Sequence, residues 1–165
     1  VLIYAKRYGL STVVVRLPNV YGPRAAIHSA EFTFNNYFIG LALQGNPITV
    51  YKPGTQLRNI LYVDDAVDAL LAAAQCHKAI GRTFFAVGDK HYSVINIAEK
   101  TTSVIGGSVR LVEWPKERKA IEVGDAVISN AEIKKVLGWR PLIDLDQGLE
   151  NTSMFFRDKL DCYLK

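Results

Sequence analysis

The sequence predicts an α/β fold, because segments with the period of strands alternate along the chain with segments that have the period of helices. Residues 11–17 (STVVVRL) and 82–89 (RTFFAVGD) are short runs rich in β-branched and aromatic residues. Such runs are typical of strands buried on both faces of a parallel sheet. The chain has 165 residues, of which 49% are hydrophobic and 22% charged, enough for one domain with a proper core. We expect a single domain over residues 1–165.

The expected elements follow from local periods and from residues that begin or end helices. Strands are expected at 11–17, 48–54, 57–63, 82–89 and 108–114. Helices are expected at 1–9, 29–43, 66–76, 92–106, 129–138 and 144–164. The predicted caps are Gly9 at the end of the first helix and, at helix starts, Asp64 or Asp65, Ser93, and Ser129 or Asn130. Residues 115–128 have no clear period.

Composition excludes several classes of function. The net charge of +4 comes from 20 basic and 16 acidic residues with no Lys/Arg block, so we expect no nucleic-acid partner. No apolar run approaches the ~20 residues that a membrane helix needs, so we expect no membrane span. Cys76 and Cys162 lie far apart without the spacing of metal ligands, which predicts neither a disulfide framework nor a zinc site. A reducing, cytoplasmic location is the expectation.

Three segments together resemble a known family. They are residues 16–24 (RLPNVYGPR), 45–73 (GNPITVYKPGTQLRNILYVDDAVDALLAA) and 137–152 (LGWRPLIDLDQGLENT). In order and spacing they resemble the carboxy-terminal half of extended short-chain dehydrogenases, the NAD-dependent nucleotide-sugar epimerases and dehydratases of which UDP-glucose 4-epimerase is the best-known type. The resemblance implies the C-terminal part of a Rossmann-like doubly wound sheet plus the small substrate-binding subdomain.

The first segment implies contacts near the nicotinamide. In the family, Leu17 and Pro18 would be nicotinamide neighbours, and the side chain of Asn19 would reach the diphosphate of the nucleotide sugar. An amide can donate to a phosphate oxygen without adding charge beside the site of hydride transfer. The alternative is that Asn19 only shapes a turn before Gly22 and Pro23.

The second segment implies a pyrophosphate site at Arg58. A guanidinium stays charged at any working pH and presents donors in a fork that matches two phosphate oxygens. The alternative is a solvated strand end or a salt bridge to a nearby carboxylate. Asn59 stands where the family usually has Asp, which we expect to leave Arg58 less tied to a protein partner. Arg118 is the expected second phosphate ligand. The alternative is that residues 114–125 form a solvated basic loop.

The same resemblance places the nucleoside base against a strand. Val50 and Tyr51 would supply the backbone and packing contacts, while Lys52 and Pro53 depart from the usual family pattern and put base specificity in doubt. Asn35 would add a polar contact to the ligand. The alternative for Asn35 is an asparagine on the helix surface.

The sequence contains no glycine-rich turn for the NAD pyrophosphate and no Tyr-x-x-x-Lys pair ahead of residues 11–17. We therefore expect the chain to be the nucleotide-sugar-binding half of an epimerase, or else of a dehydratase, inactive alone and without bound NAD. The expected ligand is a UDP-, CDP- or dTDP-linked sugar. Two alternatives stay open: a non-catalytic nucleotide-sugar sensor, and an assembly module that pairs as a homo-oligomer or with the missing N-terminal half.

Overall fold

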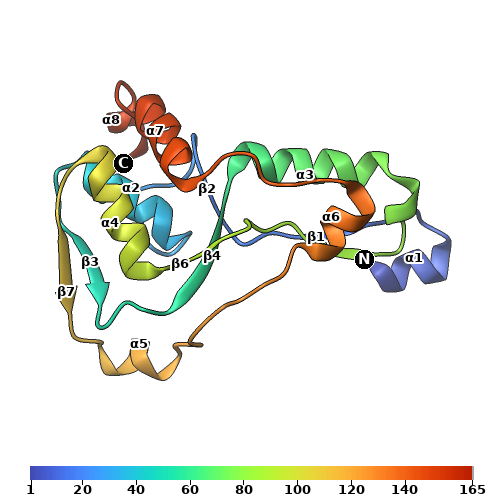
Figure 1. The fold of residues 1–165 in the computed structure, drawn as a ribbon, viewed down its shortest axis with the longest axis horizontal. Coiled ribbons are helices and arrows are strands. Elements are labelled where there is room, and N and C mark those ends of the chain that lie inside the picture. Colours follow the sequence, from blue (N-terminus) through green and yellow to red (C-terminus); the bar gives the residue numbers. More distant parts are fainter. Residues whose placement is uncertain (165) are drawn as a thin grey trace.

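The computed structural model describes residues 1–164 and confirms the α/β prediction (Figure 1). The helices are α1 Leu2–Tyr8, α2 Phe34–Leu43, α3 Val63–Gln75, η1 His77–Ala79, α4 Val94–Ile105, α5 Lys116–Ala120, α6 Ala131–Leu137, α7 Leu145–Phe156 and α8 Leu160–Tyr163. The strands are β1 Val14–Arg16, β2 Asn19–Tyr21, β3 Ile48–Tyr51, β4 Leu57–Tyr62, β5 Thr83–Phe85, β6 His91–Ser93 and β7 Val109–Val112.

The strands form three small sheets in which most pairs are parallel. Strand β1 pairs with β5, β2 with β4, and β3 with β7, all in parallel, while β6 runs antiparallel to the start of β4. Each parallel pair joins strands far apart in sequence, as crossover connections require. The parallel pairing of β3 with β7 brings residues 48–51 beside residues 109–112, so the segment after β7 lies near the start of β4.

Strand β4 connects the two hydrophobic cores. Its side chains alternate between faces, so Ile60 and Tyr62 belong to one core while Leu61 belongs to the other. The first core lies among α2, β3, α4 and α7, at the left of Figure 1, and the second lies among α3, β5 and α6, at the right. Because one short strand is buried on both faces, movement of β4 would disturb both cores.

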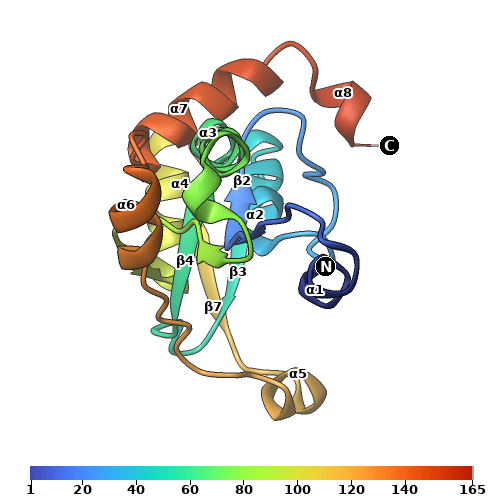
Figure 2. The same ribbon diagram turned by 90° about the vertical axis from the view of Figure 1, so that its right-hand side faces the viewer.

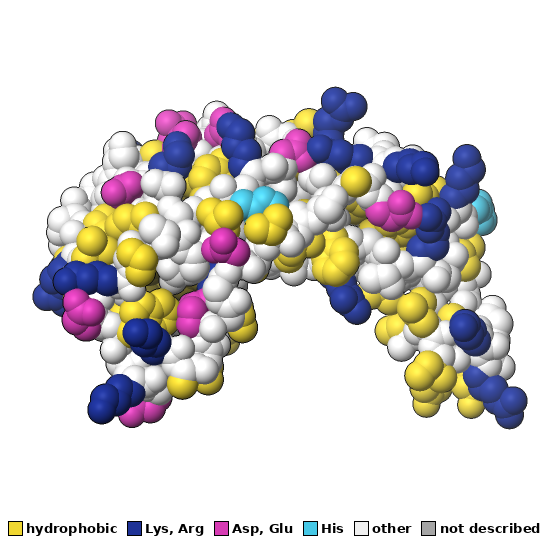
Figure 3. All heavy atoms as spheres, turned by 60° about the horizontal axis from the view of Figure 1, so that its bottom comes forward, with side chains coloured by type: hydrophobic (Ala, Val, Ile, Leu, Met, Phe, Trp, Pro, Cys, Tyr) yellow, Lys and Arg dark blue, Asp and Glu magenta, His cyan; other side chains and the backbone are white. Residues whose placement is uncertain are grey.

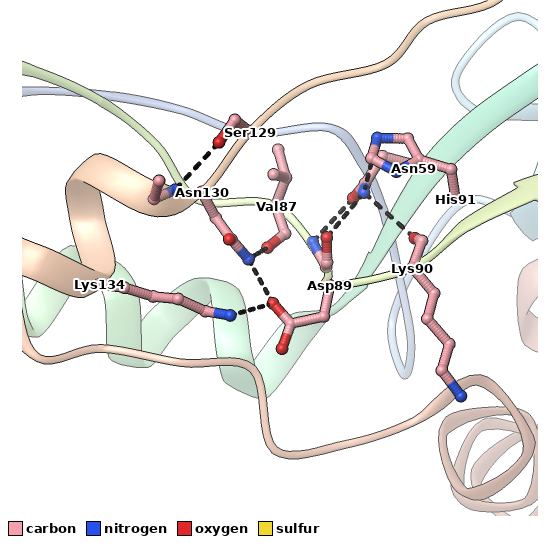
Figure 4. A network of polar contacts seen from close by, with 10 residues as sticks. Asn59, Val87, Asp89, Lys90, His91, Ser129, Asn130 and Lys134 are labelled. Carbon is pink, nitrogen blue, oxygen red and sulfur yellow. Dashed lines mark hydrogen bonds and ion pairs between the residues drawn. The ribbon is translucent and has the colours of Figure 1, made fainter.

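A polar network joins the end of β5 to β4 and to the start of α6 (Figure 4). Asn59 is 2% exposed, donates to the carbonyl oxygens of Gly88 and Lys90 at 2.9 and 3.2 Å, and accepts from Gly88 N–H at 2.8 Å. Asn130 donates to the carbonyl oxygen of Val87 at 2.9 Å and to the Asp89 carboxylate at 2.6 Å. These bonds satisfy buried polar groups where the chain leaves the sheet.

Two of the predicted caps are confirmed. Gly9 ends α1 in the left-handed conformation with φ 67°, where glycine carries no Cβ penalty. The Ser93 hydroxyl accepts from Asn96 N–H at the start of α4. At α6, Asn130 occupies the predicted N-cap position, but its side chain serves the network above and makes no cap bond. The Ser129 hydroxyl accepts from Ala131 N–H.

The prediction that Asp64 or Asp65 caps a helix at residue 66 is wrong. Helix α3 begins at Val63, and neither aspartate makes a side-chain cap bond. The buried carboxylate of Asp65 instead accepts from the backbone N–H groups of Leu142 and Ile143 at 2.9 and 3.1 Å. The Asp65 carboxylate therefore bonds to a segment distant in the sequence and not to the start of its own helix.

Other boundaries differ from the local patterns. Helix α2 begins at Phe34 rather than residue 29, because the preceding residues form a loop despite their aromatic content. The helix expected over 144–164 ends at Phe156 and resumes as the short α8. The short α5 lies in the segment that had no clear period. Residues 18–24 were expected to form a loop but contain β2, and β6 was not predicted either. Within residues 1–164, no helix is long and apolar enough to cross a membrane.

Apolar side chains are exposed on α1 and α3. On α3, the side chains that face outward are Val67, Leu70 and Leu71, while Ala66, Ala69 and Ala73 on its other side are buried. Figure 2 shows α1 standing away from the rest of the chain, and Figure 3 shows hydrophobic side chains at that end of the molecule, beyond a broad hollow. These helices thus present apolar surface that no described residue covers.

Candidate functional site

A cleft of about 500 Å³ lies where α2, β3, the start of β4 and α5 come together. It is lined by Ala30, Phe34, Tyr37, Phe38, Thr49, Val50, Tyr51, Gln56, Arg58, Val94, Trp114, Arg118, Ile121 and Glu122. The structure thus brings together four of the residues predicted for substrate binding, Val50, Tyr51, Arg58 and Arg118. Its size falls within the range of small-ligand pockets, roughly 300–1,000 Å³.

Arg58 is held by the segment of residues 121–130, which follows α5 and is called the strap below. The Arg58 Nη1 group donates to the carbonyl oxygens of Leu57 and Gly124 at 2.9 and 2.5 Å. Its Nη2 group donates to Glu122 Oε1 at 2.6 Å, and the side chains of this ion pair are only 16% and 23% exposed. The structure therefore realises the salt-bridge alternative for Arg58.

The expectation that Asn59 leaves Arg58 less tied to a protein partner is wrong. Neighbouring residues of a strand point to opposite faces, so Asn59 turns to the network at Gly88 while Arg58 turns to the strap. The anionic partner of Arg58 comes from Glu122, which lies 64 residues away in the sequence. The residue next to an arginine in a strand does not decide its charge partner.

The strap is attached to the start of β4 beside Arg58. Asp125 Oδ1 accepts from Leu57 N–H at 2.7 Å, and Ala126 N–H donates to the carbonyl oxygen of Leu57 at 3.0 Å. Further along, Ile128 N–H donates to His91 Nε2 at 3.0 Å. These bonds fix the strap independently of the Arg58 guanidinium.

Aromatic side chains form the apolar part of the cleft. The rings of Tyr51 and Trp114 lie 4.6 Å apart between centroids with a tilt of 32°, and Trp114 Nε1 donates to the carbonyl oxygen of Lys52 at 2.5 Å. Phe34 and Phe38, both on α2, pack edge to face with their ring centroids 5.3 Å apart. Flat apolar rings can stack on the face of a nucleobase, which suits this wall to a nucleotide.

Charge in the cleft is carried by few side chains. Arg58, Arg118 and Glu122 are the charged residues among those that line it. Arg118 lies on α5 and is exposed. Lys52, which departs from the usual family pattern, pairs with Glu113 at 2.8 Å and is not among the lining residues. Two guanidinium groups beside an apolar wall can bind an anionic ligand that carries an aromatic ring.

The other predicted site residues are not among those that line this cleft. Asn19 lies in β2 and donates to the carbonyl oxygen of Asn59 at 3.3 Å. Leu17 and Pro18 connect β1 to β2, and Leu17 is exposed. Asn35 is 3% exposed, so it is not an asparagine on the helix surface, and neither of its side-chain polar atoms has a hydrogen-bond partner among the described residues. Their roles toward a ligand stay predictions.

Glu122 and Trp114 line the cleft although sequence reasoning assigned them no role. Both belong to the region around α5, which showed no period beyond the expected strand at 108–114. A tryptophan directly before a basic segment was a signal for Trp114. For Glu122 there was none, because only the path of the strap brings it to Arg58.

Comparison with known proteins decides the family. The family model described as "NAD dependent epimerase/dehydratase family" matches residues 1–98. This match covers more than half of the 165 residues. The chain belongs to the NAD-dependent epimerase/dehydratase family. The resemblance predicted from the three sequence segments is thereby confirmed.

Curated relatives within this family act on UDP-linked sugars, as their names state. The chain is 33% identical to UDP-glucuronic acid decarboxylase 3 of Arabidopsis thaliana, over 96% of this chain and 44% of the relative. It is 32% identical to UDP-N-acetyl-alpha-D-glucosaminuronate decarboxylase of Bacillus cytotoxicus, over 91% of this chain and 47% of the relative. The chain thus spans slightly less than half the length of these relatives.

Solved structures show the same fold. UDP-glucose 4-epimerase of Thermotoga maritima, solved with UDP-glucose, matches with a TM-score of 0.84 and 27% identity, over 96% of this chain and 50% of that one. The Bordetella bronchiseptica enzyme WbmF, solved with NAD+ and UDP, matches with a TM-score of 0.83 and 26% identity, over 98% and 50%. The predicted Rossmann-like fold is confirmed.

The predicted nicotinamide neighbour Leu17 lies at an edge of the sheet where a cofactor can approach. Leu17 presents an exposed apolar side chain after the carboxyl end of the parallel strand β1, the edge at which Rossmann-like sheets bind ligands. The sequence carries no glycine-rich turn that could hold the cofactor's pyrophosphate.

Proposed function

We propose that this chain binds a UDP-linked sugar in the cleft between α2, β3 and α5, as the nucleotide-sugar-binding half of an NAD-dependent enzyme. The observation that carries the proposal is the convergence of Arg58, Arg118 and the aromatic pair Tyr51 and Trp114 on one cleft. A nucleoside diphosphate carries an aromatic base and a charged diphosphate, and the cleft offers a partner for each.

In the proposed arrangement, Arg58 and Arg118 bind the diphosphate. Arg58 is fixed to β4 and its guanidinium reaches the cleft, while Arg118 enters from α5 on a different segment of the chain. Charge-assisted hydrogen bonds from two arginines hold an anion more strongly than neutral donors do. The base stacks on the wall formed by Tyr51 and Trp114, with Val50 packing beneath it.

The choice of UDP is supported by relatives. Both curated relatives named above act on UDP-linked substrates, and both solved neighbours contain UDP or UDP-glucose. CDP- and dTDP-linked sugars are less well supported.

For the intact enzyme we propose oxidation of the bound sugar by NAD as the first chemical step. When bound, NAD would accept a hydride from a sugar carbon and give a keto sugar. Epimerisation is the outcome predicted from sequence, and the neighbour from Thermotoga maritima is an epimerase. Decarboxylation is a second candidate, favoured by the curated relatives at 32–33% identity. This chain would supply substrate binding, and the Tyr-x-x-x-Lys pair would come from residues outside it.

The decisive experiment is calorimetric titration of the 165-residue protein with UDP, comparing the wild type with Arg58→Ala. We expect Arg58→Ala to weaken binding by at least about tenfold, because hydrogen bonds to charged groups contribute roughly 1.5–3 kcal/mol each. The matched control is Arg157→Ala, which removes an exposed arginine directly after α7 and should leave UDP binding unchanged.

Equal affinities of Arg58→Ala and the wild type for UDP would contradict the proposed site. A nucleotide-sugar sensor would pass this test as well as half of an enzyme would. Sequencing the coding region upstream of Val1 distinguishes a sensor from half of an enzyme. The enzyme hypothesis predicts a Tyr-x-x-x-Lys pair and a glycine-rich turn there.

A further inference from the structure

We propose that Glu122 is an internal competitor for Arg58, whose carboxylate takes the position on the guanidinium that the ligand's diphosphate occupies in the complex. This inference rests on the proposed function, because it assumes that Arg58 binds a diphosphate. It adds that ligand affinity is set by an exchange between two anions on one arginine.

The geometry of the ion pair points to competition. Glu122 and Arg58 both line the cleft, so the carboxylate lies on the side of the guanidinium from which a ligand approaches. Glu122 Oε1 accepts from Arg58 Nη2 at 2.6 Å and also from Gly124 N–H at 3.0 Å. The carbonyl oxygen of Gly124 occupies Nη1. Both terminal nitrogens of Arg58 therefore donate to the strap, so a diphosphate that contacts Nη2 competes with Glu122 for it.

Electrostatics strengthens the competition. The side chains of Arg58 and Glu122 are 16% and 23% exposed, so water screens their charges incompletely. While the pair is closed, the carboxylate cancels the charge of Arg58 and leaves Arg118 as the one uncompensated cation among the described lining residues. A diphosphate beside the closed pair would also be repelled by Glu122. Departure of the carboxylate from Arg58 would thus strengthen binding of the diphosphate.

The Glu122 side chain can release Arg58 while the strap stays attached. Asp125 and Ala126 are bonded to the backbone of Leu57, and Ile128 is bonded to His91, so these contacts do not use the guanidinium. Rotation of the Glu122 side chain alone would free Nη2 of Arg58 for the ligand, while Nη1 stays bonded to the carbonyl oxygen of Gly124. The exchange is therefore local and does not require a change of fold.

The test is the affinity of the 165-residue protein for UDP in Glu122→Gln, measured by calorimetry. We expect binding about fivefold to tenfold tighter than in the wild type, because the competing charge is lost while the shape of the side chain is kept. Glu122→Asp, which withdraws the carboxylate by one methylene, should give a smaller gain. The matched control is Glu113→Gln, which makes the same change of net charge at an exposed glutamate paired with Lys52 and should leave affinity unchanged.

A double-mutant cycle separates competition from a general charge effect. In the Arg58→Ala background, Glu122→Gln should give a clearly smaller gain, because the competition needs the arginine and only repulsion by the carboxylate remains. Weaker or unchanged UDP binding in Glu122→Gln and Glu122→Asp would overturn the proposal and make Glu122 a residue that positions Arg58. An equal gain with Glu113→Gln would also overturn it. Failure of the proposed function is distinct, since UDP binding would then not depend on Arg58 at all.

Discussion

Replacing Asp65 by alanine is expected to destabilise the protein by about 3 kcal/mol or more. The Asp65 side chain is 2% exposed and its two oxygens accept from Leu142 N–H at 2.9 Å and from Ile143 N–H at 3.1 Å. Hydrogen bonds to charged groups contribute roughly 1.5–3 kcal/mol each, which gives the lower bound of about 3 kcal/mol for two such bonds. The loss would free the segment between α6 and α7.

The assay is urea unfolding at pH 7, followed by circular dichroism, for the wild type, Asp65→Ala and Asp64→Ala. The neighbouring Asp64 is exposed and shares the first turn of α3, so its replacement removes the same interaction with the helix dipole, about 0.3–1 kcal/mol, and no buried bond. The difference between the two variants isolates the two bonds to residues 142 and 143. If both variants lost the same stability, Asp65 would act only through the helix start and this reasoning would be refuted.

Two further predictions concern packing and pH. Gly40→Ala should destabilise the protein by about 1–3 kcal/mol in the same assay, because the added Cβ would lie 2.1 Å from the backbone oxygen of Ile27, which cannot rotate away; a variant as stable as the wild type would contradict this packing. The Lys134 ammonium and the Asn130 amide hold the pKa of Asp89 below its ordinary value, so the stability they add is present above about pH 4 and is lost as the pH falls through the lowered pKa. Because this pair is half exposed, Asp89→Asn should lower the free energy of unfolding by less than about 1 kcal/mol at pH 7. The variant should also lose less stability than the wild type as the pH falls from about 5 to about 2. An equal loss of stability in both proteins over that range would contradict the assignment.

Local patterns were sufficient for most of the elements. The β-branched and aromatic runs predicted the cores of β1, β3, β4, β5 and β7, since such residues favour strands and each run is bounded by turn residues. Gly9 and Ser93 were predictable because their capping roles depend only on adjacent backbone. Helix starts were less predictable. Phe32 and Phe34 both belong to the apolar pattern that predicted a helix over residues 29–43, but only Phe34 lies in α2.

Part of the candidate cleft could be predicted from the sequence, because most of the chosen residues lie in a segment that resembles the family in order and spacing. Val50, Tyr51 and Arg58 were chosen from residues 45–73 and Arg118 from residues 115–128, and all four line one cleft. The pairing of β3 with β7 explains this, since it carries the segment with Arg118 back beside β3. The remaining chosen residues are not among the lining ones, and their roles rest on the resemblance alone.

The sequence by itself determined the α/β class, the family and the arginine on which the proposed site depends, because these follow from local periods and from motifs of fixed spacing. Only the tertiary structure decided what Arg58, Asp65 and Asn59 contact. Each of these side chains meets a group 29 to 78 residues away, and the choice of partner depends on the face of the strand or helix and on the path of the strap. A polar side chain that is buried takes whichever partner the packed chain brings within reach, and no local pattern records that partner.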